Sequence, residues 1–284
     1  MLKDPVNMVD GQPAFNGVGT LIDWKSLGID PVDAIKANCA KVADRFIPTQ
    51  DDLKDEPIAL VAYGGSLNDT WGDISDFDTI FTCSGAHRFL IDRGIIPTYH
   101  VDSDPRRHKI GMLGEPRPEI TYMVASICDP GYADFLISKG IPKIVLWHIF
   151  FMEQEILGIM PQREWMLTGG DTIGPRMMKI ARLMGYTNMR FFGFDSSTEN
   201  PSKTHAGTHP NPRQGVKPIR YNGRTYFSTD DWEVHAQIMI DDLDRMPEVN
   251  YRFYGDGLLQ AMARGHVPVM RSRRPLGVET YAVN

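Results

Sequence analysis

The sequence predicts an α/β fold with a doubly wound, mostly parallel sheet of the Rossmann-like kind, and three observations lead to this prediction. Short apolar runs alternate with helical patterns of roughly ten to fifteen residues between Pro57 and Phe194, as in parallel strands joined by crossover helices. The first run, Ile58 to Tyr63, is apolar throughout and ends in two glycines, as expected of a strand covered on both faces. A chain of 284 residues can also bury one full core.

The individual strands and helices follow from the same pattern. Buried strands are predicted at 58–63, 79–83, 97–101, 119–125, 143–148 and 190–194. Helices between them are predicted at 84–93, 132–139 and 174–184. A glycine follows each of these helices. Because glycine is the commonest residue just beyond a helix end, it marks where each helix stops.

Additions flank this core at both ends. Residues 1–56 are predicted to form an N-terminal arm with a cap helix that opens at Asp30-Pro31, since proline suits the first turn of a helix. Residues 57–200 form the nucleotide-binding domain. Residues 201–284 form an active-site loop and a C-terminal α+β extension, with helices at 230–245 and 258–264 and a strand at 251–254. The polar stretch 196–224 is predicted to be irregular, and so long a loop is usually functional or disordered.

Composition and charge exclude several classes of protein. The net charge of −6 disfavours a nucleic-acid partner. Cys39, Cys83 and Cys128 form no CxxC pair, so neither a zinc knuckle nor a disulfide framework is expected. No apolar run has the length of a membrane span and the N-terminus has no signal-peptide core, so a cytoplasmic protein is expected. The Walker pattern GxxxxGK[ST] is absent, which excludes a P-loop kinase.

Polar residues that follow the predicted strands form the candidate site, because doubly wound sheets bind ligands beyond the carboxyl ends of their strands. Gly64 and Gly65 let the backbone approach a ligand, and Ser66 with a helix starting near Asn68 would hold a phosphate. An ordinary turn without a ligand is the alternative. The other candidates at strand ends or helix starts are Ser84, Asp102, Asp104, Gly169, Gly170, Asp171, Thr172 and Asp195.

Two of these carboxylates are candidate metal ligands. Asp102 and Asp104 lie two residues apart at the end of the third strand, so in an extended segment they point to one side. Such a pair can hold Mg²⁺ or Mn²⁺ beside the phosphates of a nucleotide. A simple turn at Asp104-Pro105 is the alternative, and Asp104 is also a candidate catalytic residue.

His205 and Asp195 are the remaining catalytic candidates. His205 lies on the long loop, and its imidazole would titrate near neutral pH, so it could deprotonate an acceptor hydroxyl. A solvated loop histidine is the alternative. His205 and His209 would suit a metal on a helix, but Gly207 and Pro210 argue against a helix there. Asp195 could bind a ribose or acceptor hydroxyl, or cap the next element.

Several of these residues carry a resemblance to a known family. The runs VAYGGSL at 61–67, VDSDP at 101–105, TGGDT at 168–172 and FGFD at 192–195 resemble, in this order, the MptE-like (DUF115) family. That family includes archaeal 6-hydroxymethylpterin diphosphokinases and the central domain of Maf flagellin glycosyltransferases. The glycine-serine turn also looks like that of bacterial sialyltransferases, which use CMP-sugars. The resemblance covers about residues 57–210.

The resemblance implies a transferase that binds a nucleotide-activated donor. The donor contacts that it implies are Gly64, Gly65, Ser66, Asn68, Ser84, Gly169, Gly170, Asp171 and Thr172. The sequence departs from the family pattern at Ala62, where a glycine is common, at Asp171, where a serine is common, and at Ser84, where the sialyltransferases have an asparagine. These departures leave the identity of the donor open.

A glycosyltransferase that uses a nucleotide-sugar is the favoured function, because the additions at both ends exceed what a compact pyrophosphoryl transferase needs. One alternative is a 6-hydroxymethylpterin diphosphokinase that uses ATP and Mg²⁺. Another is a non-catalytic module that binds a nucleotide or sugar phosphate. The expected partners are a small-molecule nucleotide donor, an acceptor hydroxyl on a glycan, protein or small molecule, and, as an open alternative, further copies of the chain in a homo-oligomer.

Overall fold

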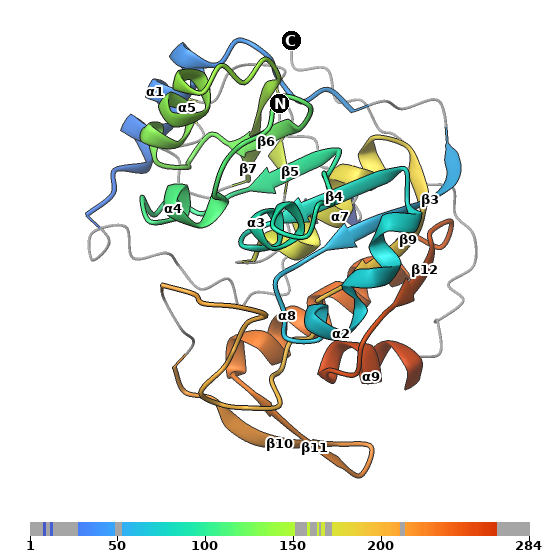
Figure 1. The fold of residues 1–284 in the computed structure, drawn as a ribbon. Coiled ribbons are helices and arrows are strands. Elements are labelled where there is room, and N and C mark those ends of the chain that lie inside the picture. Colours follow the sequence, from blue (N-terminus) through green and yellow to red (C-terminus); the bar gives the residue numbers. More distant parts are fainter. Residues whose placement is uncertain are drawn as a thin grey trace.

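The computed structural model describes residues 28–48, 53–150, 158–159, 164, 166–167, 172–210 and 214–265, and two short paired strands, β1 (Met8–Val9) and β2 (Gln12–Pro13). Its centre is an eight-stranded sheet with the order β12-β9-β3-β4-β5-β6-β7-β8 (Figure 1). Every pairing described in this sheet is parallel. The predicted doubly wound α/β fold is therefore confirmed.

All six predicted strands are present in the sheet. They are β3 (Lys54–Val61), β4 (Thr79–Cys83), β5 (Tyr99–Asp102), β6 (Thr121–Ala125), β7 (Ile144–Ile149) and β9 (Tyr186–Phe192). Two short strands extend it, β8 (Met166–Leu167) beside β7 and β12 (Asn250–Phe253) beside β9. Because β12 comes from the C-terminal extension, that extension is built into the central sheet.

Helices connect the strands close to the predicted positions. They are α1 (Pro31–Lys41), α2 (Leu67–Thr70), α3 (Ala86–Ile91), α4 (Lys109–Leu113), α5 (Pro130–Ser138), α7 (Ile173–Leu183), α8 (Asp230–Asp244) and α9 (Leu258–Gly265), with a 3₁₀ turn, η1 (Trp71–Asp76), after α2. Helix α1 begins as predicted, because the Asp30 side chain accepts the N–H groups of Val32 and Asp33. None of the described helices is long and apolar enough to cross a membrane.

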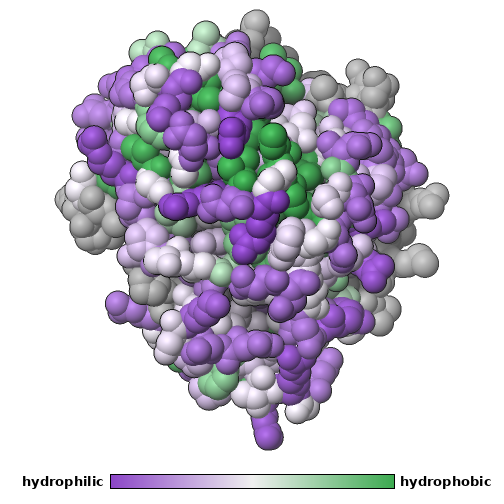
Figure 2. All heavy atoms as spheres, viewed as in Figure 1, coloured by the Kyte–Doolittle hydropathy of each residue, from purple (hydrophilic) through white to green (hydrophobic). Residues whose placement is uncertain are grey.

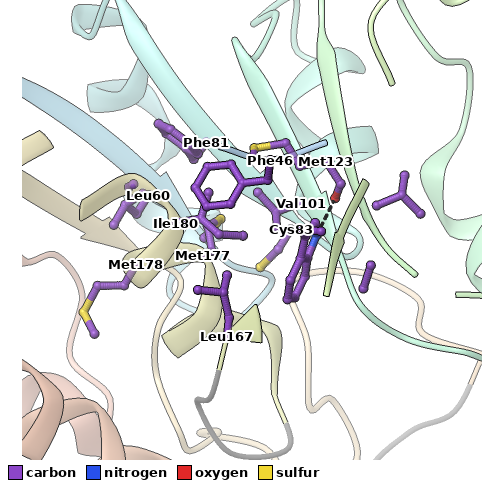
Figure 3. Packing of buried hydrophobic residues seen from close by; sticks show 14 of the residues in the cluster. Phe46, Leu60, Phe81, Cys83, Val101, Met123, Leu167, Met177, Met178 and Ile180 are labelled. Carbon is purple, nitrogen blue, oxygen red and sulfur yellow. Dashed lines mark hydrogen bonds between the residues drawn. The ribbon is translucent and has the colours of Figure 1, made fainter. Parts of the chain in front are cut away.

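The second half of strand β3, Ile58 to Val61, is buried on both faces, which explains the continuous apolar sequence there. Ala59 and Val61 pack in a cluster with Leu67 of α2 and Leu90 of α3. The alternate residues Ile58 and Leu60 belong to the larger cluster, which α7 and α8 help to form. Figure 3 shows Leu60, Phe81, Met177 and Ile180 among the packed side chains of that larger cluster.

A hairpin replaces part of the predicted irregular loop. Strands β10 (Lys217–Tyr221) and β11 (Arg224–Ser228) pair antiparallel around Asn222 and Gly223. These two residues have φ angles of 47° and 78°, and an Asn-Gly pair with positive φ is a strong hairpin signal. The prediction was therefore wrong for 217–224. The hairpin lies at the lower end of Figure 1, where Figure 2 shows a mainly hydrophilic surface.

Helix α3 carries a buried histidine, His87, which contacts α4 and β6. His87 is fully buried, and its Nδ1 lies 2.7 Å from the Leu113 carbonyl oxygen, which can only accept, so Nδ1 carries the proton. Its Nε2 therefore accepts from the Tyr122 hydroxyl at 3.0 Å. Burial, reinforced by the neighbouring His100, lowers the pKa of His87 to about 3. His87 thus stays neutral in the folded protein at any ordinary pH.

We expect the stability of the protein to fall as the pH drops from about 6.5 towards 4. The reason is that His87 binds a proton in the unfolded chain in this pH range but stays neutral in the folded protein. The contribution of His87 to the free energy of unfolding is fully present above its unfolded pKa and decreases below it. Through this residue, the free energy of unfolding changes with a slope of at most about 1.4 kcal/mol per pH unit. Urea unfolding at several pH values measures the slope. His87→Gln, which cannot be protonated, should flatten it, and an unchanged slope would contradict the assignment.

Candidate functional site

A cavity lies where strands β3 and β4 end, at the edge at which ligands of this fold bind. Its volume is about 340 Å³. It is lined by residues that follow these strands, by helices α3 and α4, and by the long loop: Tyr63, Gly85, Arg88, His108, Gly111, Met112, Thr208 and Pro210. The ring of Tyr63 lies so close to Gly85 that a Cβ there would be 2.4 Å from ring carbon Cε1. Only glycine fits beside this tyrosine.

The glycine turn next to the cavity is joined to the end of β9. The Gly64 N–H donates to the Gly193 carbonyl oxygen at 2.9 Å. The backbone N–H and hydroxyl of Ser66 both donate to the Asp195 carboxylate, the former at 2.8 Å. Gln260 of α9 donates to the same carboxylate at 2.7 Å. Asp195 therefore connects the ends of two strands with the last described helix.

These contacts differ from the predicted phosphate subsite. The donors of Gly64 and Ser66 are already paired, and Asp195 brings a negative charge against the turn. Gly64 is required by the neighbouring strand, because a Cβ there would lie 2.4 Å from the Gly193 carbonyl oxygen. At Gly65 the nearest atom to such a Cβ is 3.9 Å away. Phosphate binding by this turn therefore stays a prediction, with Gly65 as its open position.

Asp195 has the environment of a structural carboxylate. It is buried, and burial raises the pKa of its carboxyl group, while the hydrogen bonds from Ser66 and Gln260 oppose that rise. Its backbone carbonyl also accepts from Leu259 of α9. A catalytic role for Asp195 therefore stays a prediction, and the described contacts favour the alternative in which Asp195 joins neighbouring elements.

Asn68 holds the long loop against the glycine turn. Its side-chain N–H groups donate to the carbonyl oxygens of Gly65 and Ala206, both at 3.1 Å. The Ala206 N–H donates in turn to the Tyr63 carbonyl oxygen at 3.1 Å. The predicted helix near Asn68 is α2, a single turn. Sequence reasoning placed Asn68 at the phosphate, whereas the structure shows it between two backbone segments.

The long loop brings His205 beside the cavity wall. Its ring lies 5.9 Å from that of Tyr63 and stacks on His209 with 4.1 Å between ring centroids. The Thr204 hydroxyl lies 3.0 Å from His205 Nδ1. The segment 204–209 is not helical, as Gly207 and Pro210 predicted. His205 is thus close to Tyr63, which lines the cavity.

A second polar group lies at the ends of β4 and β5. The Lys109 ammonium group donates to the Ser84 hydroxyl at 2.9 Å and lies 3.6 Å from Asp104 Oδ2. Arg106 binds both carboxylate oxygens of Asp104, at 2.8 and 2.5 Å. Burial works to raise the pKa of Asp104, but Arg106 and Lys109 hold it below its ordinary value. Asp104 therefore stays ionised between two cations.

Asp102 is buried deeper in the same group. Its Oδ1 accepts the backbone N–H groups of Ser103 and Asp104, at 2.7 and 3.1 Å. Its Oδ2 lies 3.9 Å from Nε2 of the buried His100. Burial works to raise the pKa of Asp102, but His100, Lys109 and the Asp104 N–H outweigh it and hold the pKa below its ordinary value.

This arrangement does not fit a divalent cation. Both oxygens of Asp104 face Arg106, and one oxygen of Asp102 is bound by backbone N–H groups. Among the side chains that the structure describes, the nearest donor to Asp102 Oδ2 is His100 Nε2, at 3.9 Å, and the positive charges of Arg106 and Lys109 would repel an ion beside Asp104. Within the described residues, no group of three or more His, Cys, Asp and Glu side chains could hold a metal. The Asp102–Asp104 metal site thus stays a prediction that these contacts disfavour.

The last predicted contacts precede α7. Gly169, Gly170 and Asp171 lie outside the described residues. Thr172 is the N-cap residue of α7, and its side chain makes no capping hydrogen bond. None of the residues that line the cavity was predicted as a site residue from the sequence, and the polar ones among them include Tyr63, Arg88 and His108. The only signal for Tyr63 was its place directly before the glycine turn, and Arg88 and His108 had none.

Comparison with known proteins shows what the chain is similar to. The family model described as 6-hydroxymethylpterin diphosphokinase MptE-like matches residues 33–201. The solved Maf glycosyltransferase from Magnetospirillum magneticum AMB-1 has a TM-score of 0.62 and 19% identity, over 81% of this chain and 37% of that one. A mammalian sialyltransferase, solved with Gal-beta-1-3GalNAc-ortho-nitrophenol, has a TM-score of 0.43 and 12% identity, over 82% and 84%. No curated protein matches the chain. The chain thus shares its fold with the Maf protein and spans little more than a third of it.

Proposed function

The chain belongs to the MptE-like family, and from this premise we propose that it is a transferase that moves a glycosyl group from a nucleotide-sugar to an acceptor hydroxyl. The observation that carries the proposal is the cavity at the carboxyl ends of β3 and β4, with His205 close to its wall. The fold shared with the Maf glycosyltransferase supports glycosyl transfer over other group transfers.

The lining of the cavity suits an anionic ligand that has flat or apolar faces. Tyr63 and Met112 offer apolar surface, Arg88 offers positive charge, and His108, whose pKa is lowered by burial, offers a neutral imidazole that can donate a hydrogen bond. No carboxylate is among the lining residues. A nucleotide-sugar has the matching parts, a base and a sugar ring for the apolar surface and phosphates for Arg88 and His108.

In the proposed reaction, His205 takes the proton of the acceptor hydroxyl, and the oxygen attacks the anomeric carbon of the donor sugar. The bond from that carbon to the nucleotide phosphate breaks, and the phosphate leaves with the bonding electrons. The Arg88 guanidinium and a hydrogen bond from the neutral His108 imidazole stabilise the charge that develops on this leaving phosphate. Each part of the site therefore has a defined task in the transfer.

A donor screen tests the proposal. The protein is incubated with CMP-, UDP- and GDP-sugars and a panel of glycan and peptide acceptors, and release of the free nucleotide is followed by chromatography. Acceptor-dependent release of a nucleoside mono- or diphosphate is the expected result. Binding of a nucleotide without turnover on any acceptor would favour the non-catalytic module instead.

Pyrophosphoryl transfer is the second candidate, and the description of the matching family favours it. With ATP and 6-hydroxymethylpterin, such a reaction would move the β- and γ-phosphates to the pterin hydroxyl and release AMP. Sugar transfer releases no AMP. The identity of the released nucleotide therefore separates the two candidates in one experiment.

His205→Ala is expected to lower turnover roughly 10²- to 10⁴-fold while nucleotide affinity stays nearly intact, because a general base acts on the acceptor proton only in the transition state. The rate of the parent protein should rise with pH through one group near neutrality, and the variant should lose this dependence. His209→Ala is the matched control, since His209 stacks on His205 in the same loop. Equal turnover in His205→Ala and the parent would show that His205 is not the general base.

A further inference from the structure

We propose that Lys109 is the fixed cation of a phosphate subsite, that it acts through the Ser84 hydroxyl, and that phosphate binding there needs no divalent metal ion. The inference deepens the proposed function, because it identifies what receives the donor phosphates next to the cavity. Ser84 and Lys109 directly adjoin two residues that line the cavity, Gly85 and His108. The subsite and the cavity are therefore continuous along the chain.

In the hydrogen bond with Lys109, Ser84 is the acceptor, so its hydroxyl hydrogen can still donate to another group. The Lys109 side chain is 8% exposed, and its ammonium group donates to the Ser84 oxygen at 2.9 Å. Ser84 itself is only half-buried, and its hydroxyl hydrogen has no acceptor within the part of the chain that the structure describes. A hydroxyl that accepts from a cation is polarised and becomes a stronger donor. An anion is the ligand that such a donor prefers.

The backbone at Ser84 is held in a rare conformation. Its φ angle is 53°, in the left-handed region that serine seldom occupies. Strain of this kind persists where the surrounding structure enforces it, and it is concentrated at functional sites. The left-handed turn and the bond to Lys109 together place the hydroxyl at the carboxyl ends of β4 and β5. The strained residue and the buried cation are independent observations that indicate the same subsite.

The charges around Lys109 explain why no metal ion is required. Arg106 and Lys109 supply two positive charges that balance the two carboxylates of Asp102 and Asp104, so the group needs no further cation. Arg106 is bound to Asp104 through both oxygens, which leaves Lys109 as the buried cation that also reaches a hydroxyl. The two aspartates thus hold the cations in place instead of binding a metal.

Binding of inorganic pyrophosphate, UDP and uridine, each measured by calorimetry with EDTA and then with Mg²⁺, tests the proposal. We expect the parent protein to bind pyrophosphate and UDP in EDTA, with affinities that Mg²⁺ changes less than about threefold. Lys109→Met and Ser84→Gly should each weaken both ligands roughly 10- to 100-fold, the range for loss of a charge-assisted hydrogen bond, and leave any uridine affinity unchanged.

Ser84→Gly should remain folded, because glycine adopts the positive φ angle at least as well as serine. Lys139→Met is the charge-matched control, since Lys139 pairs with Glu115 on the surface and lies outside the site. If Lys109 only neutralises Asp104, Lys109→Met will leave the ratio of UDP to uridine affinity unchanged, which overturns the proposal. Two other results would overturn the proposal: phosphate binding that requires Mg²⁺, and no binding of either pyrophosphate or UDP. Pyrophosphate binding without UDP binding would instead support the subsite and count against the nucleotide-sugar donor.

Discussion

Asp195→Ala is expected to lower the free energy of unfolding by roughly 3–5 kcal/mol, because leaving a buried donor unpaired costs about 1–3 kcal/mol each time. The substitution removes the acceptor of the Ser66 N–H, the Ser66 hydroxyl and the Gln260 amide. Urea unfolding measures the loss as a lower midpoint with an unchanged slope. The glycine turn should loosen with it, so ligand binding at the cavity should weaken as well.

Ser66→Ala is the matched control for this prediction. It removes only the hydroxyl and keeps the backbone bond to Asp195, so a loss of about 1 kcal/mol is expected. A normal unfolding midpoint for Asp195→Ala together with a large loss of turnover would show the opposite role. Asp195 would then contact the substrate, as the sequence-based hypothesis of a catalytic Asp195 has it.

Lys179→Met is expected to destabilise the protein by about 3–5 kcal/mol, because it removes one member of a buried ion pair. Lys179 of α7 and Asp242 of α8 are 3.0 Å apart, and their side chains are 0% and 2% exposed. Arg245 reaches the same carboxylate at 3.4 Å and offsets only part of the loss. Urea unfolding again measures the change.

The double variant Lys179→Met/Asp242→Leu should regain most of this stability, since replacing a whole buried ion pair by apolar side chains is often neutral. Arg182→Ala is the control on the same helix, α7. Its pair with Glu248 is partly exposed, so the expected loss is below about 1 kcal/mol. A double variant as unstable as the single one would mean that the destabilisation comes from packing and not from loss of the ion pair.

The strands could be predicted from the sequence because their signal is local. The segment at 79–83, Thr-Ile-Phe-Thr-Cys, is rich in β-branched and apolar residues, and it is β4 in the structure with the same bounds. The helix at 174–184 differs from α7 by one residue at each end, since Gly185 marks its stop. The Asn222-Gly223 hairpin was missed although its signal is also local, because the surrounding polar residues were interpreted as one irregular loop.

The candidate site was predictable only in its location. The polar residues after the strands do gather at one edge of the sheet, because parallel strands bring their carboxyl ends together. Their partners were not predictable. Asp195 binds Ser66 across 129 positions of sequence, and Lys109 meets Ser84 across 25. No periodicity or spacing encodes contacts of this kind, so residues predicted to face a ligand are partly paired with each other.

The sequence by itself determined the alternation of strands and helices, and with it the doubly wound sheet and the edge at which a ligand would bind. The spacing of apolar residues and the positions of turn residues are properties of short segments, so they can be recognised in the sequence without knowledge of the fold. The tertiary structure alone decided which donors at that edge remain available. It pairs Ser66 with Asp195 and Asp104 with Arg106, and it leaves the Ser84 hydroxyl beside Lys109 without an acceptor in the described chain. Hydrogen bonds and charges depend on distances across the fold, and these distances exist only once the chain has folded.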